Sequence, residues 1–198
     1  MIEGTTMRII IYGAGAIGCV IGGHLFRQGY NVVLVGNPQH IDAINANGLR
    51  LVTGDETFTL HIPSVKTPNE LAPFHGDDVV MLCSKSQHTL KCLGQLRNSG
   101  VSRTLPIFIC QNSIWNESAA TRVFDKIYGV MLFIDAVFLT PGEVINPVTG
   151  RWGFIEVGCY PSGKDGLCEE IALALRHAGF SAMVNGEVMK SKGSASLI

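Results

Sequence analysis

Charged residues are scarce in this chain of 198 residues. They make up 16% of it, against about 25% in an average soluble domain, and 15 basic against 16 acidic residues leave a net charge of −1. A nucleic-acid-binding protein needs a basic face to neutralise phosphates, so this composition argues against a nucleic-acid partner. Hydrophobic residues reach 46% and the mean hydropathy is +0.28, which excludes a disordered chain and allows a large buried core.

Cysteine pairs of the kind that bind metals are also missing. None of the six cysteines belongs to a Cys-x-x-Cys pair, and no cysteine–histidine cluster has the spacing of a zinc site. We therefore expect no metal. Several of the cysteines lie in apolar runs, where a free thiol behaves as a small hydrophobic group, so we expect reduced thiols and a cytoplasmic protein.

A long uncharged segment raises the question of a membrane. Residues 9–25 contain no Asp, Glu, Lys or Arg, and the segment is near the length of a spanning helix or of a signal-peptide core. Five glycines crowd this segment, however, and its first residues favour a β-strand. A strand, a glycine turn and a buried helix explain the same residues, so we predict no membrane partner.

Apolar runs alternate with helical patterns along most of the chain. This alternation predicts an α/β fold with a Rossmann-like, doubly wound and largely parallel sheet. The strands are expected at residues 8–12, 31–35, 49–53, 57–62, 78–84, 104–110, 128–138, 143–146, 153–157 and 181–184. Those at 128–138, 143–146 and 153–157 are expected to form a mixed edge. The helices are expected at residues 16–28, 40–47, 87–97, 117–124 and 165–177. The tail, residues 186–198, does not fit the pattern.

A glycine-rich motif follows the first strand and opens the first helix. It reads Gly13-Ala14-Gly15-Ala16-Ile17-Gly18 and fits G-x-G-x-x-G in the required context. Gly13 permits the tight turn, Gly15 lets a diphosphate approach the backbone, and Gly18 lets the helix pack on the strand. The helix N-terminus adds N–H donors and a partial positive charge. The motif predicts a dinucleotide site; the alternative is a glycine turn that serves packing alone.

The end of the second strand bears on the choice of dinucleotide. A site that prefers NAD usually has an acidic residue there, which holds the ribose 2′-hydroxyl. Here the chain reads Val35-Gly36-Asn37, without an acid and without an arginine. We expect NADP(H) with modest discrimination, because Asn37 can donate to a 2′-phosphate and His40 can add charge if it is protonated.

These motifs together resemble the ketopantoate reductase (2-dehydropantoate 2-reductase) family. The resemblance runs over about residues 7–186. It is carried by the glycine motif, Val33-Leu34-Val35-Gly36, Ala46-Asn47-Gly48-Leu49-Arg50-Leu51, Lys85-Ser86-Gln87-His88-Thr89, Gln111-Asn112-Ser113, Ile134-Asp135-Ala136 and Pro141-Gly142-Glu143-Val144.

The resemblance implies NADPH-dependent reduction of a 2-keto acid to a 2-hydroxy acid, within pantothenate synthesis. By position, Asn37 stands where the family usually has an arginine for the 2′-phosphate, and Lys85 lies by the cofactor. Asn112 would lie beside both nicotinamide and substrate, and Ala136 near the nicotinamide. Alternatively, Lys85 is a solvated lysine at a helix start, and Asn112 is a turn residue or a helix cap.

The family's acid is a lysine at the start of an all-helical second domain, and the tail resembles the start of that domain's first helix. We therefore divide the chain into a dinucleotide-binding domain (1–185) and a stub (186–198), with the second domain mostly absent. The position of the acid falls on Ala195 or, with one inserted residue, on Ser196. Lys192 is the nearest substitute and Lys190 the next, although a solvated tail explains both more simply.

Two functional hypotheses follow. The first is the cofactor half of a 2-keto acid reductase, with little or no turnover alone because loss of a general acid costs about 10²–10⁴ in rate. The second is a non-catalytic NADP-binding or interaction module. In either case an apolar face left uncovered should favour self-association, which size-exclusion chromatography would detect.

Overall fold

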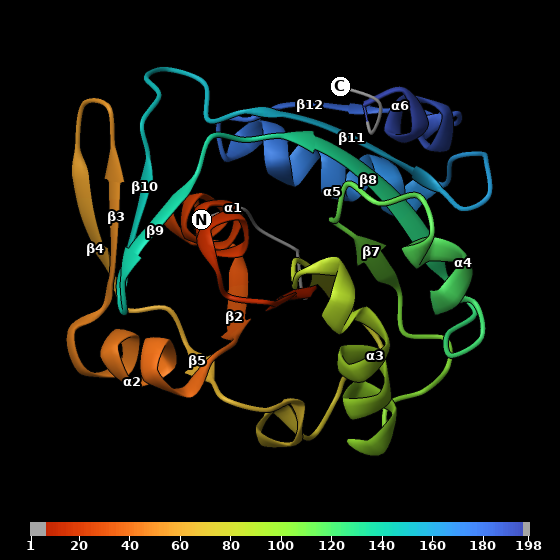
Figure 1. The fold of residues 1–198 in the computed structure, drawn as a ribbon, viewed down its shortest axis with the longest axis horizontal. Helices are drawn as coiled ribbons and strands as arrows, with labels where there is room; N and C mark the ends of the chain where they lie inside the picture. Colours follow the sequence, from red (N-terminus) through yellow and green to blue (C-terminus); the bar gives the residue numbers. More distant parts are fainter. Residues whose placement is uncertain (1–6, 196–198) are drawn as a thin grey trace.

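This computed structural model describes residues 7–195, and a large sheet crosses the molecule (Figure 1). The sheet has eight strands. Its strands are β1 (Arg8–Tyr12), β2 (Asn31–Val35), β5 (Ser64–Val65), β6 (Asp78–Leu82), β7 (Ile107–Ile109), β8 (Ile127–Phe133), β11 (Phe154–Cys159) and β12 (Ser181–Val184). Their order is β12-β11-β8-β7-β6-β1-β2-β5. Every neighbouring pair is parallel except β8 with β11. The predicted largely parallel sheet is confirmed.

Both faces of the sheet are covered, as the continuous apolar strands require. In β1, Ile9 and Ile11 point into one hydrophobic core, while Ile10 and Tyr12 point into the other. Helices α1 (Ala16–Arg27), α2 (Pro38–Asn47) and α5 (Gly166–His177) contribute to the first core. Helices α3 (Thr89–Asn98) and α4 (Asn116–Ala120) contribute to the second. A strand that is buried on both faces has apolar side chains at successive positions and no polar–apolar alternation, which explains the continuous apolar run of β1.

A second, four-stranded sheet corrects the prediction for residues 128–146. It consists of β3 (Leu49–Thr53), β4 (Thr57–Leu60), β9 (Val137–Thr140) and β10 (Glu143–Asn146), in the order β4-β3-β10-β9. The single strand expected at 128–138 is wrong, because the chain leaves the large sheet after Phe133. The Asn146 side chain fixes this crossing by donating to the carbonyls of Asp135 (2.7 Å) and Trp152 (3.2 Å). Because the residues on both sides of this break are apolar, the sequence does not indicate that the strand ends at Phe133.

Smaller differences concern where elements begin and end. The strand expected at 104–110 is only β7, since Pro106 just before it has no N–H for the ladder. The helix expected at 117–124 ends at Ala120, and the one expected at 87–97 is a short 3-10 turn (η2, Ser86–His88) followed by α3. The two-residue strand β5 and a second 3-10 turn (η1, Pro68–Leu71) were not predicted.

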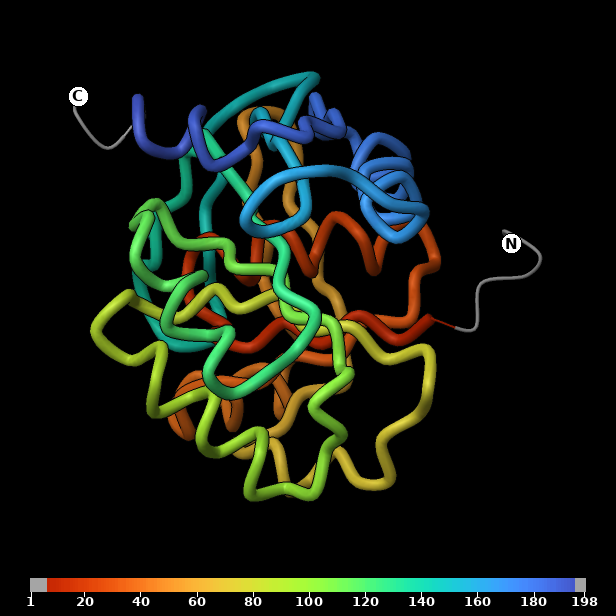
Figure 2. The backbone as a smooth tube through the Cα atoms, turned by 90° about the vertical axis from the view of Figure 1, so that its right-hand side faces the viewer, coloured from red at the N-terminus to blue at the C-terminus, as the bar shows by residue number. Residues whose placement is uncertain are grey.

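The tail forms a helix, α6 (Val188–Ala195), which lies at the upper edge of the molecule in Figure 2. It packs on β8 and β11, where two glycines leave room for it. A Cβ on Gly129 would lie 2.9 Å from the Met189 sulfur, and one on Gly158 would lie 2.9 Å from Val188. Ser196 lies outside the described residues, as does the side chain of Ala195, and the division at residue 185 stays a prediction.

The uncharged segment at residues 9–25 is the strand β1, the glycine turn and most of α1, as predicted. Across residues 7–195, no helix combines the length and the apolar character needed to cross a bilayer.

Candidate functional site

The glycine turn joins β1, which lies between β6 and β2 in the large sheet, to α1. Both the Gly13 and the Ala14 N–H groups donate to the Val35 carbonyl, at 2.9 and 3.0 Å. Gly13 has φ = +110°, and a Cβ there would lie 2.3 Å from the Ser84 nitrogen. Only glycine fits this position, because a side chain would meet both backbone strain and the neighbouring strand.

The other two glycines of the motif have separate tasks. A Cβ on Gly18 would lie 2.3 Å from the Gly13 carbonyl oxygen, so Gly18 permits the close packing of α1 on the turn. A Cβ on Gly15 would meet nothing within 4 Å among the described residues. Gly15 is the N-cap of α1; no side chain caps the helix, and its first turn contains no acid. The helix thus presents bare N–H groups to a space that a side chain at Gly15 would fill.

The turn lies at the point where the chain reverses its direction across the sheet. From β1 the chain builds β2 and β5 on one side, and then β6, β7 and β8 on the other. The carboxyl ends of β1 and β6 therefore border a crevice, which is where open α/β sheets bind ligands. Two pockets flank this crevice, and Ser84 lines both of them.

The first pocket, the β7–β8 pocket, has a volume of about 460 Å³. Ile17 of the glycine motif, Lys85 and Asn112 all line it. The wall consists of residues 17, 83–86, 110–112, 132–135, 148, 152 and 153. Lys85 and Asn112 are exposed, so their polar groups can reach a ligand. Ala136 is half-buried and packs against the core just beyond this wall.

A buried glutamine network holds Asn112 at the end of β7. The Gln111 amide donates to the Ser84 carbonyl (2.5 Å), and its oxygen accepts from Thr89 (2.9 Å) and from Asn116 (2.6 Å). These bonds tie the ends of β6 and β7 to the starts of α3 and α4. Gln111 therefore positions its neighbour Asn112, which is a role that the local sequence does not reveal.

The second pocket, the β2 pocket, has a volume of about 310 Å³ and lies on the other side of the turn. Gly13 lines it at the end of β1, and Gly36 and Asn37 line it at the end of β2. The Asn37 oxygen caps α2 by accepting from the Gln39 N–H (3.0 Å), which leaves its amide group to donate.

Three basic side chains also line the β2 pocket: Lys66, His88 and Lys91. The sequence did not indicate a ligand for any of them. Lys66 follows β5, which pairs with β2, and the Gly36 N–H donates to the Val65 carbonyl (3.2 Å). Its ammonium pairs with Asp42 at 2.7 Å in an exposed position. A strand of two residues leaves no periodic signal, so the sequence could not place Lys66 here.

His40 does not supply the charge expected of it. It is buried, its Nδ1 accepts from the Gly142 N–H (2.8 Å), and its other ring nitrogen contacts the Cys19 sulfur (3.3 Å). Burial lowers the pKa of His40, so the ring stays neutral. The prediction is wrong because His40 faces the core between the two sheets.

The tail lysines differ from each other. Lys190 is exposed and pairs with Glu187 (2.7 Å), which confirms its solvated position. Lys192 is fully buried, pairs with Glu117 and donates to the Ile109 carbonyl (3.2 Å), so the solvated position expected for it is wrong. Burial raises the pKa of Glu117, and the Lys192 ammonium opposes that rise. The catalytic role considered for Lys192 stays a prediction without support from this geometry, because Lys192 lines neither pocket.

Comparisons with known proteins agree with this geometry. The ketopantoate reductase PanE/ApbA family matches residues 9–162. The chain is similar to the 2-dehydropantoate 2-reductases of Pyrococcus abyssi (30% identical, covering 92% of this chain and 58% of the relative) and Pyrococcus horikoshii (30%, 97% and 60%). It thus spans about three-fifths of the length of these curated relatives.

Solved structures show the same fold. A 2-dehydropantoate 2-reductase from Geobacter metallireducens superposes with a TM-score of 0.80 at 30% identity, covering 91% of this chain and 58% of that one. A PanE/ApbA family ketopantoate reductase from Ralstonia eutropha gives a TM-score of 0.83 at 25% identity, with coverages of 96% and 60%. A D-mandelate dehydrogenase solved with NADH shares the fold (TM-score 0.82, 24% identity). With its glycine turn, its parallel sheet and these matches, the chain belongs to the ketopantoate reductase PanE/ApbA family.

Proposed function

We propose that this chain is the nucleotide-binding part of an oxidoreductase that uses NADPH to reduce a 2-keto acid, 2-dehydropantoate in the first instance, to a 2-hydroxy acid. The observation that carries the proposal is the bare N-terminus of α1 beside Gly15, at the crevice between β1 and β6. A diphosphate fits this space because it needs N–H donors and no side chain in the way.

The two pockets divide the dinucleotide between them. The β2 pocket, with Asn37 and Lys66, takes the adenosine end, and the β7–β8 pocket takes the nicotinamide end. When bound, NADPH supplies a hydride to the carbonyl carbon of the keto acid. Lys85 is positioned to attract the substrate carboxylate, and the Asn112 amide can donate to the substrate carbonyl oxygen. Ala136 stays a proposed neighbour of the nicotinamide.

The reduction also needs a proton for the oxygen of the product. Among the described residues, Lys85 is the only cationic side chain that lines the β7–β8 pocket. If Lys85 holds the carboxylate, it does not also serve as the acid. We therefore propose that this chain alone binds NADPH but turns over slowly or not at all.

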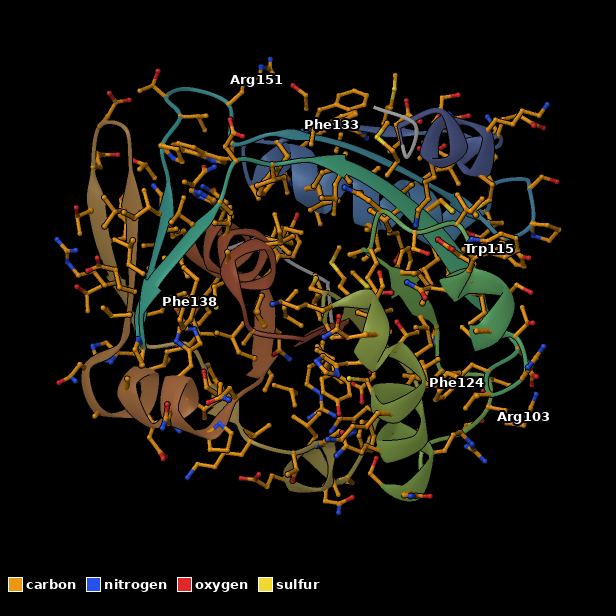
Figure 3. All side chains as sticks on the ribbon, viewed as in Figure 1. Arg103, Trp115, Phe124, Phe133, Phe138 and Arg151 are labelled. Carbon is orange, nitrogen blue, oxygen red and sulfur yellow. The ribbon has the colours of Figure 1, made fainter. Side chains whose placement is uncertain are left out.

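Large exposed apolar side chains support a further part of the proposal, self-association. Trp115 is 76% exposed and Phe133 56% exposed, and Phe138 and Leu139 of β9 are also accessible. Figure 3 labels Trp115, Phe133 and Phe138, which lie before α4, at the end of β8 and on β9. Exposed apolar side chains of this size favour contact with a second copy of the chain when another surface covers them. A cytoplasmic location stays a prediction.

Titration of the chain into NADPH tests the proposal directly. We expect saturable binding by NADPH fluorescence, followed by little loss of NADPH absorbance when 2-dehydropantoate is added. Rapid oxidation would contradict the low-turnover claim, whereas an absence of NADPH binding would contradict the proposal itself. Binding that is indifferent to every 2-keto acid tried would support the non-catalytic module instead.

Preference for NADPH over NADH is expected to depend on Lys66. Replacing Lys66 by methionine should weaken NADPH binding about 10- to 100-fold, because a charge-assisted bond to a phosphate is worth roughly 1.5–3 kcal/mol. NADH binding should not change, since NADH lacks the 2′-phosphate. The measurement is the dissociation constant of each nucleotide by fluorescence.

Two further variants sharpen this test. Asp42→Asn removes the carboxylate that pairs with Lys66 and should strengthen NADPH binding. Lys190→Met, at an exposed pair on α6, is the matched control and should change neither constant. If Lys66→Met weakened the binding of NADH and of NADPH equally, Lys66 would not contact the 2′-phosphate.

A further inference from the structure

Three ligand-bearing side chains converge at the edge of the sheet opposite the two pockets. Cys159 ends β11, Asp165 is the N-cap of α5, and Cys168 lies in the first turn of α5. Their ligand atoms all lie within 4.8 Å of one another. Cys159 pairs in register with Tyr128 at the start of β8, whereas the β7–β8 pocket lies at the end of β8. The cluster is therefore separate from the proposed nucleotide site.

The spacing of the two sulfurs fits a metal ion better than a disulfide. They lie 3.9 Å apart. Two sulfurs bound to one tetrahedral zinc ion at about 2.3 Å are about 3.8 Å apart. A disulfide needs about 2.05 Å between the sulfurs, so the observed separation is that of two unbonded thiols. The two thiols thus already have the separation of two zinc ligands.

The carboxylate of Asp165 is held in place by two hydrogen bonds. Its Oδ1 accepts from the Cys168 N–H (3.0 Å), and its Oδ2 accepts from the Tyr128 hydroxyl (2.7 Å). The Tyr128 ring in turn stacks on Phe108, with ring centroids 4.3 Å apart. Carboxylates that ligate metals are commonly oriented by such outer partners, and each oxygen keeps a lone pair for an ion.

We propose that Cys159, Asp165 and Cys168 form a site for a thiophilic divalent cation, Zn²⁺ by preference, with water as the fourth ligand. Two thiolates and one carboxylate carry three negative charges, so the loaded site has a net charge of −1. It lies at the N-terminus of α5, where the helix dipole favours an anion. The ion would fasten the loop at 160–164 between β11 and α5. Both thiols lose a proton when the ion binds.

Cobalt is the probe for this site, because tetrahedral Co²⁺ bound to thiolates absorbs visible and near-ultraviolet light. The full chain, kept reduced by a phosphine, is titrated with Co²⁺ and then with Zn²⁺. We expect one equivalent of Co²⁺ to give the thiolate–cobalt band and one equivalent of Zn²⁺ to remove it. Cys159→Ala should abolish the band.

Two conservative variants test the remaining partners. Asp165→Asn keeps the cap on α5, because asparagine also accepts from the Cys168 N–H, but weakens Co²⁺ binding at least about tenfold. Tyr128→Phe removes only the outer hydrogen bond and should weaken binding by about 10- to 100-fold. Glu169→Gln and Cys92→Ala lie outside the cluster and serve as controls that bind like the original chain.

Several results would overturn the proposal. A reduced chain that gives no thiolate–cobalt band has no such site. If the same chain, prepared without the phosphine, also yields a Cys159–Cys168 disulfide, the pair is assigned to oxidation instead. Equal affinities for the original chain and Asp165→Asn would remove the carboxylate from the ligand set. None of these readouts depends on NADPH, so they are independent of the proposed function.

Discussion

Replacement of Gly15 by valine is expected to abolish NADPH binding and leave the fold intact. The φ of Gly15 is −104°, which valine adopts without strain, and a Cβ there meets nothing within 4 Å among the described residues. Valine is a poorer N-cap than glycine, so the free energy of unfolding should fall by no more than about 1 kcal/mol. The new methyl groups would occupy the space in front of the α1 N-terminus. Binding should weaken by about 100-fold or more, which is about 2.7 kcal/mol.

The neighbouring glycines separate this effect from a loss of structure. Gly13→Ala meets a positive φ and a backbone atom at 2.3 Å, and Gly18→Ala meets the Gly13 carbonyl at the same distance. Both should lower the melting temperature and NADPH binding together. Thermal denaturation and NADPH fluorescence on the same samples make the comparison. Normal NADPH binding by Gly15→Val would place the diphosphate somewhere else.

Lys192→Met is expected to destabilise the chain by about 3–5 kcal/mol, since it leaves the Glu117 carboxylate buried without its cationic partner. For a chain of this size the melting temperature should fall by roughly 10 °C. Burial raises the pKa of Glu117, and without the Lys192 ammonium it rises further. The native variant then holds a proton that the unfolded chain releases, so its free energy of unfolding falls as pH rises above the ordinary glutamate pKa, and it falls over a wider pH range than that of the original chain. Denaturant unfolding at several pH values measures this.

Two other variants are compared with Lys192→Met. Lys192→Met combined with Glu117→Met replaces both charges by apolar groups and should recover most of the stability. Lys190→Met breaks an exposed pair and should stay within about 0.5 kcal/mol of the original chain. If Lys192→Met were as stable as Lys190→Met, the buried pair and the docking of α6 that depends on it would be refuted.

The first strand, the glycine turn and the first helix could be predicted because their signals are local. Residues 9–12 are uniformly apolar, the glycines follow at once, and the helix pattern begins within four residues. The break after Phe133 could not be predicted, since β8 and β9 are both apolar and the crossing depends on Asn146, which lies later in the chain. The prediction that His40 adds charge at the nucleotide site was wrong for the same reason, because its partners Cys19 and Gly142 are distant in sequence.

The sequence alone therefore determined the fold class, the position of the glycine turn and the resemblance to ketopantoate reductases, because each depends on residues that are close along the chain. Three placements required the three-dimensional structure: Lys66 in the β2 pocket, Lys192 beside a glutamate 75 positions away, and Cys159 beside the first turn of α5. These outcomes depend on strand order and helix docking, which bring together groups whose separation in sequence carries no periodic signal.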